Sequence, residues 1–205
     1  EQVSLSVRYG SSAKTSEDIP GVPVLRMGNI SNGKLDLNNL KYLPENHNEF
    51  PDLLLKNGDL LFNRTNSAEL VGKSAVYHGT PSPCSYASYL IAVRTSTGCL
   101  PDYLGFFVNS SFGRAWVASV VSQQVGQANV NGTKLQSLVF PMPPLPEQQR
   151  IIDEVERRLS VTDELESTIE ANLKRAERLR QSILKRAFEA NSSPKTRTMS
   201  RWVCY

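Results

Sequence analysis

The chain has 205 residues, of which 40% are apolar and 21% are charged, so it can form one hydrophobic core with an accessory element. The formal net charge of +3 permits nucleic-acid binding without demonstrating it. The three cysteines are isolated, which argues against a disulfide framework or a zinc site and fits a reducing cytoplasm, and no apolar run is long enough to cross a bilayer.

The pattern of residues 1–142 predicts a mixed α/β domain. Short β-type runs alternate with turn signals such as Ser31-Asn32-Gly33. We expect strands at 3–7, 22–27, 59–62, 74–77 and 87–94. We expect helices from 101 to about 109, where Pro101 suits a first turn, and from 113 to about 121. The amide-rich segment 123–131 is expected to be a loop. Because the chain opens on strand-like residues without an initiator methionine, we expect it to be part of a longer protein.

Residues 143–190 predict one long helix, followed by a polar, flexible tail at 191–205. Pro146 suits the first turn, and apolar positions then recur in steps of three and four, which is the coiled-coil period. The candidate partner contacts on this stripe are Ile152, Val155, Leu159, Leu165, Ile169, Leu173, Leu179 and Ile183. A helix of roughly 45 residues, at a rise of about 1.5 Å per residue, is longer than a domain of this size is wide. We therefore expect it to pair with another helix. The alternative is a helix that folds back on its own domain.

The charges of this helix are segregated, with carboxylates concentrated in its first half and Lys and Arg in its second half. An antiparallel partner of the same type would place acidic against basic halves. The same polarity suits the helix macrodipole, so helix stability alone is the alternative explanation.

Two motifs frame the helix. They are Pro143-Pro144-Leu145-Pro146-Glu147-Gln148-Gln149-Arg150-Ile151-Ile152 and Ala176-Glu177-Arg178-Leu179-Arg180-Gln181-Ser182-Ile183-Leu184-Lys185-Arg186-Ala187-Phe188. At this separation they resemble the start and end of the conserved helical region of type I restriction-modification specificity subunits. Segments 58–67, 70–73 and 87–91 resemble one class of target-recognition domain of that family, and segments 24–30 and 127–131 fit the same class.

The resemblance implies an α+β fold, in which a target-recognition domain reads half of a split site in double-stranded DNA and a coiled-coil-forming helix follows. It also implies partners: adenine methyltransferase (M) subunits docked on the helix, and a restriction (R) motor subunit in the same complex. A full subunit has two such domains and two antiparallel helices. This sequence has one of each, so it is a half subunit or a fragment, and a half subunit would form a homodimer through the helix.

DNA contacts are expected from four segments that carry amide, hydroxyl and cationic side chains, the groups that read base edges and phosphates. The candidates are Arg8, Tyr9, Ser11, Ser12, Lys14, Asn63, Arg64, Thr65, Asn66, Lys73, Gln123, Gln127, Asn129 and Asn131. Each segment has an alternative reading as a turn or a solvated loop, since Asn and Ser also hydrogen-bond their own backbone. Tyr9, Tyr86 and Tyr89 suit stacking on a base or packing in the core.

The sequence contains no pattern typical of an enzyme. Pro51-Asp52 and Pro101-Asp102 resemble the start of a nuclease motif, but no Glu-x-Lys follows at a suitable distance. His47 and His78 lack a carboxylate or cysteine at metal-ligand spacing, and no glycine-rich cofactor loop follows a strand. We therefore expect a non-catalytic, cytoplasmic protein with no metal and no cofactor. The alternatives are a coiled-coil protein-interaction adaptor and the specificity domain of a fused restriction-methylation enzyme.

Overall fold

The computed structural model describes the backbone of residues 4–124 and 127–192. Contacts divide the chain into two units, residues 1–154 and residues 155–205. The first unit contains all the strands and three of the helices of the described chain, and the second contains most of one long helix. The predicted α+β fold is therefore confirmed. Within the described part, no helix is both long and apolar enough to cross a membrane.

Four antiparallel strands form the central sheet of the first unit, in the order β1-β10-β6-β8. Their bounds are Ser4–Tyr9 (β1), Asp59–Asn63 (β6), Ser74–Tyr77 (β8) and Leu90–Thr95 (β10). Side chains alternate between the two faces of a strand. Leu60 and Phe62 accordingly join one buried apolar cluster, and Leu61 joins a second. The sheet is thus covered on both faces, which is why its central strands β6 and β10 contain consecutive apolar residues.

Three smaller sheets use shorter strands. One has the order β5-β2-β9, the second has the order β11-β12-β7, and the third is a β3-β4 hairpin. Their bounds are Val22–Leu25 (β2), Ile30–Ser31 (β3), Lys34–Leu35 (β4), Lys41–Leu43 (β5), Thr65–Asn66 (β7), Ser85–Tyr86 (β9), Ser122–Gln124 (β11) and Gln127–Asn129 (β12). A 3-10 turn, η1, covers Met27–Asn29.

Three sequence predictions need correction here. The segment 123–131 was expected to be a loop, but its described residues include two strands, since β11 and β12 pair with each other and β12 pairs with β7. The strand expected at 22–27 ends at Leu25, and η1 begins at Met27. The strand expected at 87–94 is split, since Ala87 forms an isolated bridge with Ser11 and β10 begins at Leu90.

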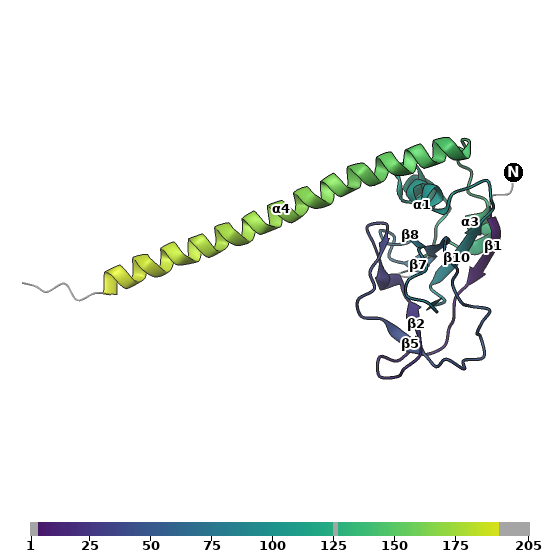
Figure 1. Ribbon diagram of the computed structural model, residues 1–205, viewed down its shortest axis with the longest axis horizontal. Helices are drawn as coiled ribbons and strands as arrows, with labels where there is room; N and C mark the ends of the chain where they lie inside the picture. Colours follow the sequence, from purple (N-terminus) through teal and green to yellow (C-terminus); the bar gives the residue numbers. More distant parts are fainter. Residues whose placement is uncertain (1–3, 125–126, 193–205) are drawn as a thin grey trace, which may run out of the picture. The chain divides into compact units, whose positions relative to one another are not determined.

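Two short helices, α1 and α2, form near the predicted positions. Figure 1 shows α1 above the central strands. α1 spans Pro101–Asn109 with Pro101 in its first turn, and it buries Leu104 and Val108 in the cluster that contains Leu60. α2 spans Ser111–Val120, and the side chain of Ser110 caps its first turn. A third helix, α3, spans Gly132–Gln136 and was not predicted. Asn131 caps it by accepting a hydrogen bond from the Lys134 N–H at 2.9 Å.

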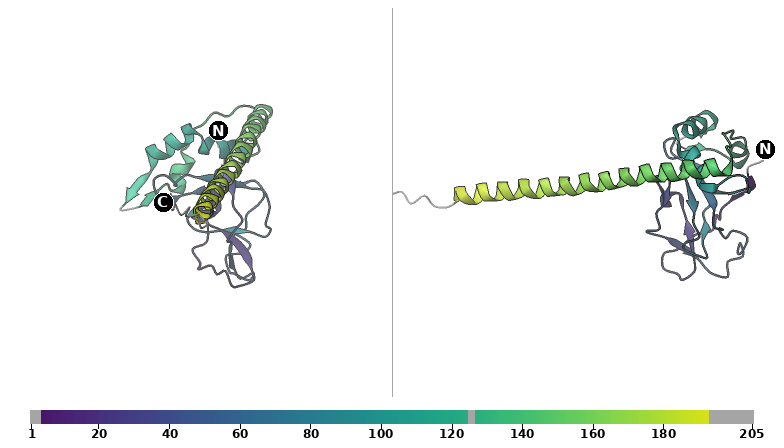
Figure 2. Two further views of the ribbon diagram at one scale, coloured as in Figure 1. Left: turned by 90° about the vertical axis from the view of Figure 1, so that its left-hand side faces the viewer. Right: turned by 45° about the horizontal axis from the view of Figure 1, so that its top comes forward.

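The long helix α4 spans Leu145–Ser192 and is uninterrupted in both views of Figure 2. Its first turns belong to the first unit. Gln148 is completely buried, accepts from the Leu100 N–H at 2.8 Å and donates to the Gly98 and Pro143 carbonyls at 2.9 Å. Ile152 joins the apolar cluster of α1. Of the tail predicted at 191–205, residues 193–205 lie outside the described chain.

Candidate nucleic-acid interface

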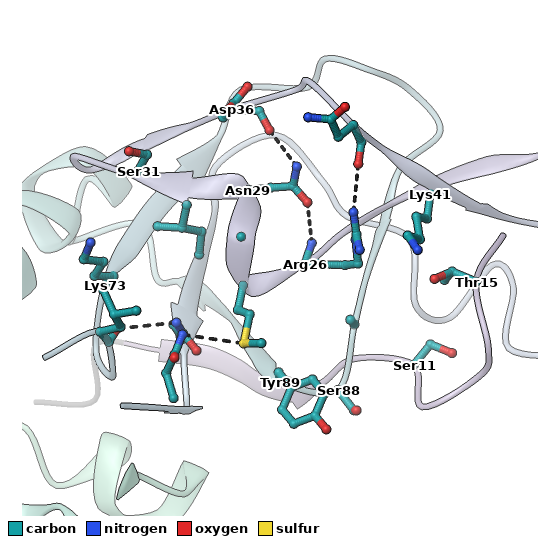
Figure 3. A pocket seen from close by; sticks show the side chains of 18 of the residues that line it. Ser11, Thr15, Arg26, Asn29, Ser31, Asp36, Lys41, Lys73, Ser88 and Tyr89 are labelled. Atoms are coloured by element: carbon teal, nitrogen blue, oxygen red, sulfur yellow. Dashed lines mark hydrogen bonds between the residues drawn. The ribbon is translucent and has the colours of Figure 1, made fainter. Parts of the chain in front are cut away.

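A pocket of about 940 Å³ opens between parts of the first unit that lie far apart in the sequence. One wall is the 11–15 loop, a second is the 26–41 segment that contains η1 and the β3-β4 hairpin, and the remainder comes from the 63–73 and 87–89 segments. In Figure 3, Lys73 lies on one side of the pocket, Lys41 and Thr15 lie on the other, and Tyr89 lies between them.

The pocket is rich in cationic groups. The cations that line it are Lys14, Arg26, Lys41 and Lys73, and the single lining carboxylate is Asp36. Lys41 pairs with Glu17 at 3.1 Å, whereas Lys14 and Lys73 form no ion pair within the described chain. Arg26 donates from Nη2 to the Asn39 carbonyl at 2.8 Å. This balance of charge suits an anionic ligand such as a phosphate backbone.

Asn29 fixes the second wall. The residue is only 4% exposed, and its side chain makes three hydrogen bonds. Its Oδ1 accepts from the Arg26 N–H at 2.9 Å, and its Nδ2 donates to the carbonyls of Asp36 at 2.8 Å and Asn38 at 3.2 Å. One buried amide therefore ties the two ends of the 27–39 segment together, and we call this segment the arm.

The first wall is held by a close approach of two backbones. A Cβ on Gly10 would lie 2.4 Å from the carbonyl oxygens of Tyr86 and Ala87, so only glycine fits there. Directly after it, the Ser11 N–H donates to the Tyr86 carbonyl at 2.9 Å, and the Ser11 hydroxyl donates to Glu49 Oε2. The 12–15 residues are thereby fixed at the mouth of the pocket.

Beside the pocket, Tyr9 and Arg64 form a second group of predicted residues. The Arg64 guanidinium lies over the Tyr9 ring at 4.8 Å from its centroid. The Tyr9 hydroxyl accepts a hydrogen bond from the Gly132 N–H at 2.8 Å, and the Arg64 carbonyl accepts from the Val130 N–H at 2.9 Å. These contacts join β1, the 63–67 segment and the start of α3.

A catalytic role would require groups such as metal ligands or nucleophiles among the described residues. Among the described residues, no three His, Cys, Asp or Glu side chains are grouped closely enough to hold a metal ion. Burial raises the pKa of the Cys84 thiol to about 12, so it is a poor nucleophile. Each histidine has one carboxylate nearby, since His47 lies 3.5 Å from Glu49 and His78 lies 3.3 Å from Asp102. Neither histidine belongs to a larger group of ligating side chains among the described residues.

A comparison with protein families decides where this chain belongs. Residues 9–175 match the family described as Type I restriction modification DNA specificity domain. The chain belongs to this family. Its pocket is thus the candidate interface of a specificity domain.

Similar proteins agree with this assignment. The Type I restriction enzyme EcoKI specificity subunit of Escherichia coli (strain K12) is 32% identical over 190 residues, which cover 92% of this chain and 41% of that protein. A chain from a study of complex assembly and conformational transition of the type I R-M system has a TM-score of 0.65 at 20% identity, covering 91% of this chain and 45% of that chain. The HsdS subunit from Thermoanaerobacter tengcongensis has a TM-score of 0.57 at 20% identity, covering 89% and 42%. The two structures support the fold, and this specificity domain spans about two fifths of the curated relatives it matches.

The structure gathers six of the predicted DNA contacts around the pocket of the specificity domain. They are Ser11, Ser12, Lys14, Asn63, Asn66 and Lys73. Two of the six have little free surface: Asn63 is 1% exposed and Ser11 is 2% exposed. The Asn63 N–H donates to the Lys73 carbonyl at 2.9 Å and its Nδ2 to the Leu70 carbonyl at 3.4 Å, while its buried Oδ1 has no partner. Asn63 therefore shapes the pocket floor more than it offers a free side chain.

The other predicted contacts lie outside the pocket lining. They are Arg8, Tyr9, Arg64, Thr65, Gln123, Gln127, Asn129 and Asn131. Thr65 is only 8% exposed, and its hydroxyl accepts from Asn129 Nδ2 at 2.6 Å across the β7-β12 pair. Arg8 donates to the Asp52 carbonyl at 2.5 Å. The Gln127 side chain is exposed, whereas that of Gln123 lies outside the described residues.

Sequence reasoning missed the second wall of the pocket, which contains the arm. Arg26, Met27, Asn29 and Lys41 all line the pocket, yet none was proposed as a DNA contact. A signal was present, because residues 26–41 combine cations and amides around an Asn-Gly turn. That pattern alone does not show that the arm faces the 11–15 loop.

The predicted stripe on α4 divides into two parts. Ile152 is 5% exposed in the core of the first unit and Val155 is half-buried, so neither offers much surface to a partner. The exposed members are Leu159, Leu165, Ile169, Leu173, Leu179 and Ile183. A row of exposed large apolar side chains on one helix is typical of an interaction surface.

Proposed function

We propose that this chain is a non-catalytic DNA-recognition module that reads one half of a bipartite site in double-stranded DNA. The observation that carries the proposal is the pocket, where three distant segments of a DNA specificity domain bring cations and amides together. Lys14 and Lys73 are suited to phosphates, which set the register on the duplex. The amides are suited to base edges, which carry the sequence information.

We further propose that α4 sets the distance between two such modules and docks adenine methyltransferase subunits, through which a restriction subunit joins the complex. The helix has 48 residues, so at about 1.5 Å each it is about 70 Å long. Its exposed stripe is suited to an antiparallel helix, supplied by a second copy if the chain is a half subunit. Two modules held at a fixed separation bind DNA as one ligand, with avidity far above that of either.

DNA selection tests the recognition step. The chain is incubated with random duplexes, bound DNA is sequenced, and an enriched motif is the expected result. No enrichment, with the methyltransferase still captured, would favour the adaptor alternative.

The salt dependence of binding to the enriched duplex tests the role of the pocket. Each neutralised phosphate contributes about −0.9 to the slope of log K against log salt concentration. Lys14→Gln and Lys73→Gln should each lower the magnitude of this slope by about 1 and weaken binding on all sequences alike. Lys56→Gln is the matched control, since Lys56 is exposed in the same unit but does not line the pocket. Slopes equal to that of the parent in both pocket variants would contradict the proposal.

A further inference from the structure

Met27 and Asn66 come from distant segments and touch at the pocket. The Asn66 Nδ2 lies 3.5 Å from the Met27 sulfur, and both residues line the pocket. Met27 is 40% exposed, so part of its apolar side chain is accessible beside the cations and amides of the pocket. An accessible apolar group beside an amide suits a ligand that has an apolar group beside a polar edge.

The hydrogen bonds of Asn66 leave part of its amide available. Its Oδ1 accepts from the Ser67 N–H at 2.8 Å, which fixes the orientation of the amide plane. An amide has two N–H groups and an oxygen with two lone pairs. One N–H and one lone pair therefore remain, and the bond to the thioether is a weak one that costs little to exchange.

The backbone that carries Asn66 is held firmly. Asn66 lies in β7 opposite Ala128 of β12, and the neighbouring Thr65 accepts from Asn129 at 2.6 Å. The Arg64 N–H on the other side donates to the Tyr89 carbonyl at 3.0 Å. An amide that reads a base must be fixed in this way, because discrimination is lost when the reading group can move to suit the wrong base.

An A·T base pair matches this pair of side chains. In the major groove, adenine presents its N7 acceptor beside its N6 donor, which an Asn amide binds in bidentate fashion, and thymine presents a methyl group. We propose that Asn66 binds the N6 and N7 edge of one adenine while Met27 packs on the methyl group of a thymine in the same or the adjacent base pair. This inference rests on the proposed function. It adds the two residues that set one position of the target.

Selection with variants provides the first test. Random duplexes are selected with the parent chain, Met27→Ala and Asn66→Ala, and with Leu37→Ala as a control. Leu37 is also 40% exposed and belongs to the arm, but it does not line the pocket. Met27→Ala should lose the thymine preference at one position, Asn66→Ala should lose the adenine preference at the same or the next base pair, and Leu37→Ala should select the parent's sequence. Unchanged preferences in both pocket variants would overturn the inference.

Base analogues provide the second test. Replacing each thymine of the selected half-site in turn with deoxyuridine removes only the methyl group. At one position the parent should bind about fourfold more weakly, the loss expected for one buried methyl group. Met27→Ala should bind the two duplexes equally. A parent that tolerates deoxyuridine everywhere, or a half-site without thymine, would overturn the inference while leaving the proposed function intact. A parent that enriches no sequence at all would overturn both.

Discussion

Removing the amide of Asn29 should release the arm from the domain. In Asn29→Ala, the Arg26 N–H and the carbonyls of Asp36 and Asn38 lose their partner. A hydrogen bond contributes about 1 kcal/mol net, and a buried group left unpaired costs about 1–3 kcal/mol. Because Asp36 and Asn38 are exposed residues, we expect water to replace the amide at their carbonyls, and so a loss of about 2 kcal/mol in the free energy of unfolding instead of the full sum.

Urea unfolding followed by circular dichroism measures this loss. With a slope of about 2 kcal/mol/M, the midpoint should fall by about 1 M. Asn48→Ala is the matched control, because Asn48 is exposed and does not line the pocket, and its midpoint should match the parent.

The same variant should also bind DNA more weakly at a temperature where it remains folded, because the second wall of the pocket is no longer held. An ordinary surface substitution changes the free energy of unfolding by no more than about 0.5 kcal/mol. If the free energy of unfolding of Asn29→Ala differs from that of the parent by no more than this, Asn29 does not hold the arm in place.

Three other predictions follow from features outside the pocket. Arg94→Met removes the cation that lies 2.7 Å from the Asp59 carboxylate, and the Asp59 side chain is only 1% exposed. The free energy of unfolding should therefore fall by about 3 kcal/mol in urea titrations. A loss below about 1 kcal/mol would show that the ion pair does not stabilise the fold. Under the proposed pairing of two copies through α4, Ile169→Asp should convert dimers into monomers in sedimentation equilibrium, whereas Ala171→Asp on the opposite side of the helix should not. A parent chain that is monomeric, or equal effects of the two variants, would refute the stripe as the pairing face. Burial raises the pKa of Cys84 to about 12, so its reactive thiolate should stay scarce until the pH rises toward that value. Iodoacetamide should therefore leave Cys84 unmodified at about pH 8 in the folded chain and modify it in concentrated urea, as judged by peptide mass spectrometry. Rapid labelling of the folded chain would show that the thiol is accessible.

The elements that could be predicted are those whose own residues determine them. The strands predicted at 59–62 and 74–77 are short runs of mostly apolar residues whose side chains are buried, so their positions match β6 and β8 closely. α1 begins at the predicted Pro101, and α4 follows its apolar period. The short strands β5, β7 and β9 have two or three residues each, and they form only because a partner strand is supplied from elsewhere in the chain.

The candidate site was predictable only in part, for a related reason. The run from Asn63 to Ser67 shows the chemistry of DNA contact, and the structure places Asn66 at the pocket. The same run cannot show which side chains turn inward, and both Asn63 and Thr65 prove to be buried. The role of the arm depends on Asn29, whose three partners are backbone groups, and no residue type in the sequence marks such partners.

The way the arm is attached has a consequence for how freely its sequence can vary. Between Asn29 and Lys41, only Ile30 is buried and Leu35, Leu40 and Lys41 are half-buried, while every other side chain is exposed. Mutations at those exposed positions alter what the arm presents without disturbing the apolar interior. Apart from Asn32, Gly33 and Asn39, whose φ angles are positive, these positions can therefore change the polar surface that the arm offers to the proposed DNA ligand at small cost to folding.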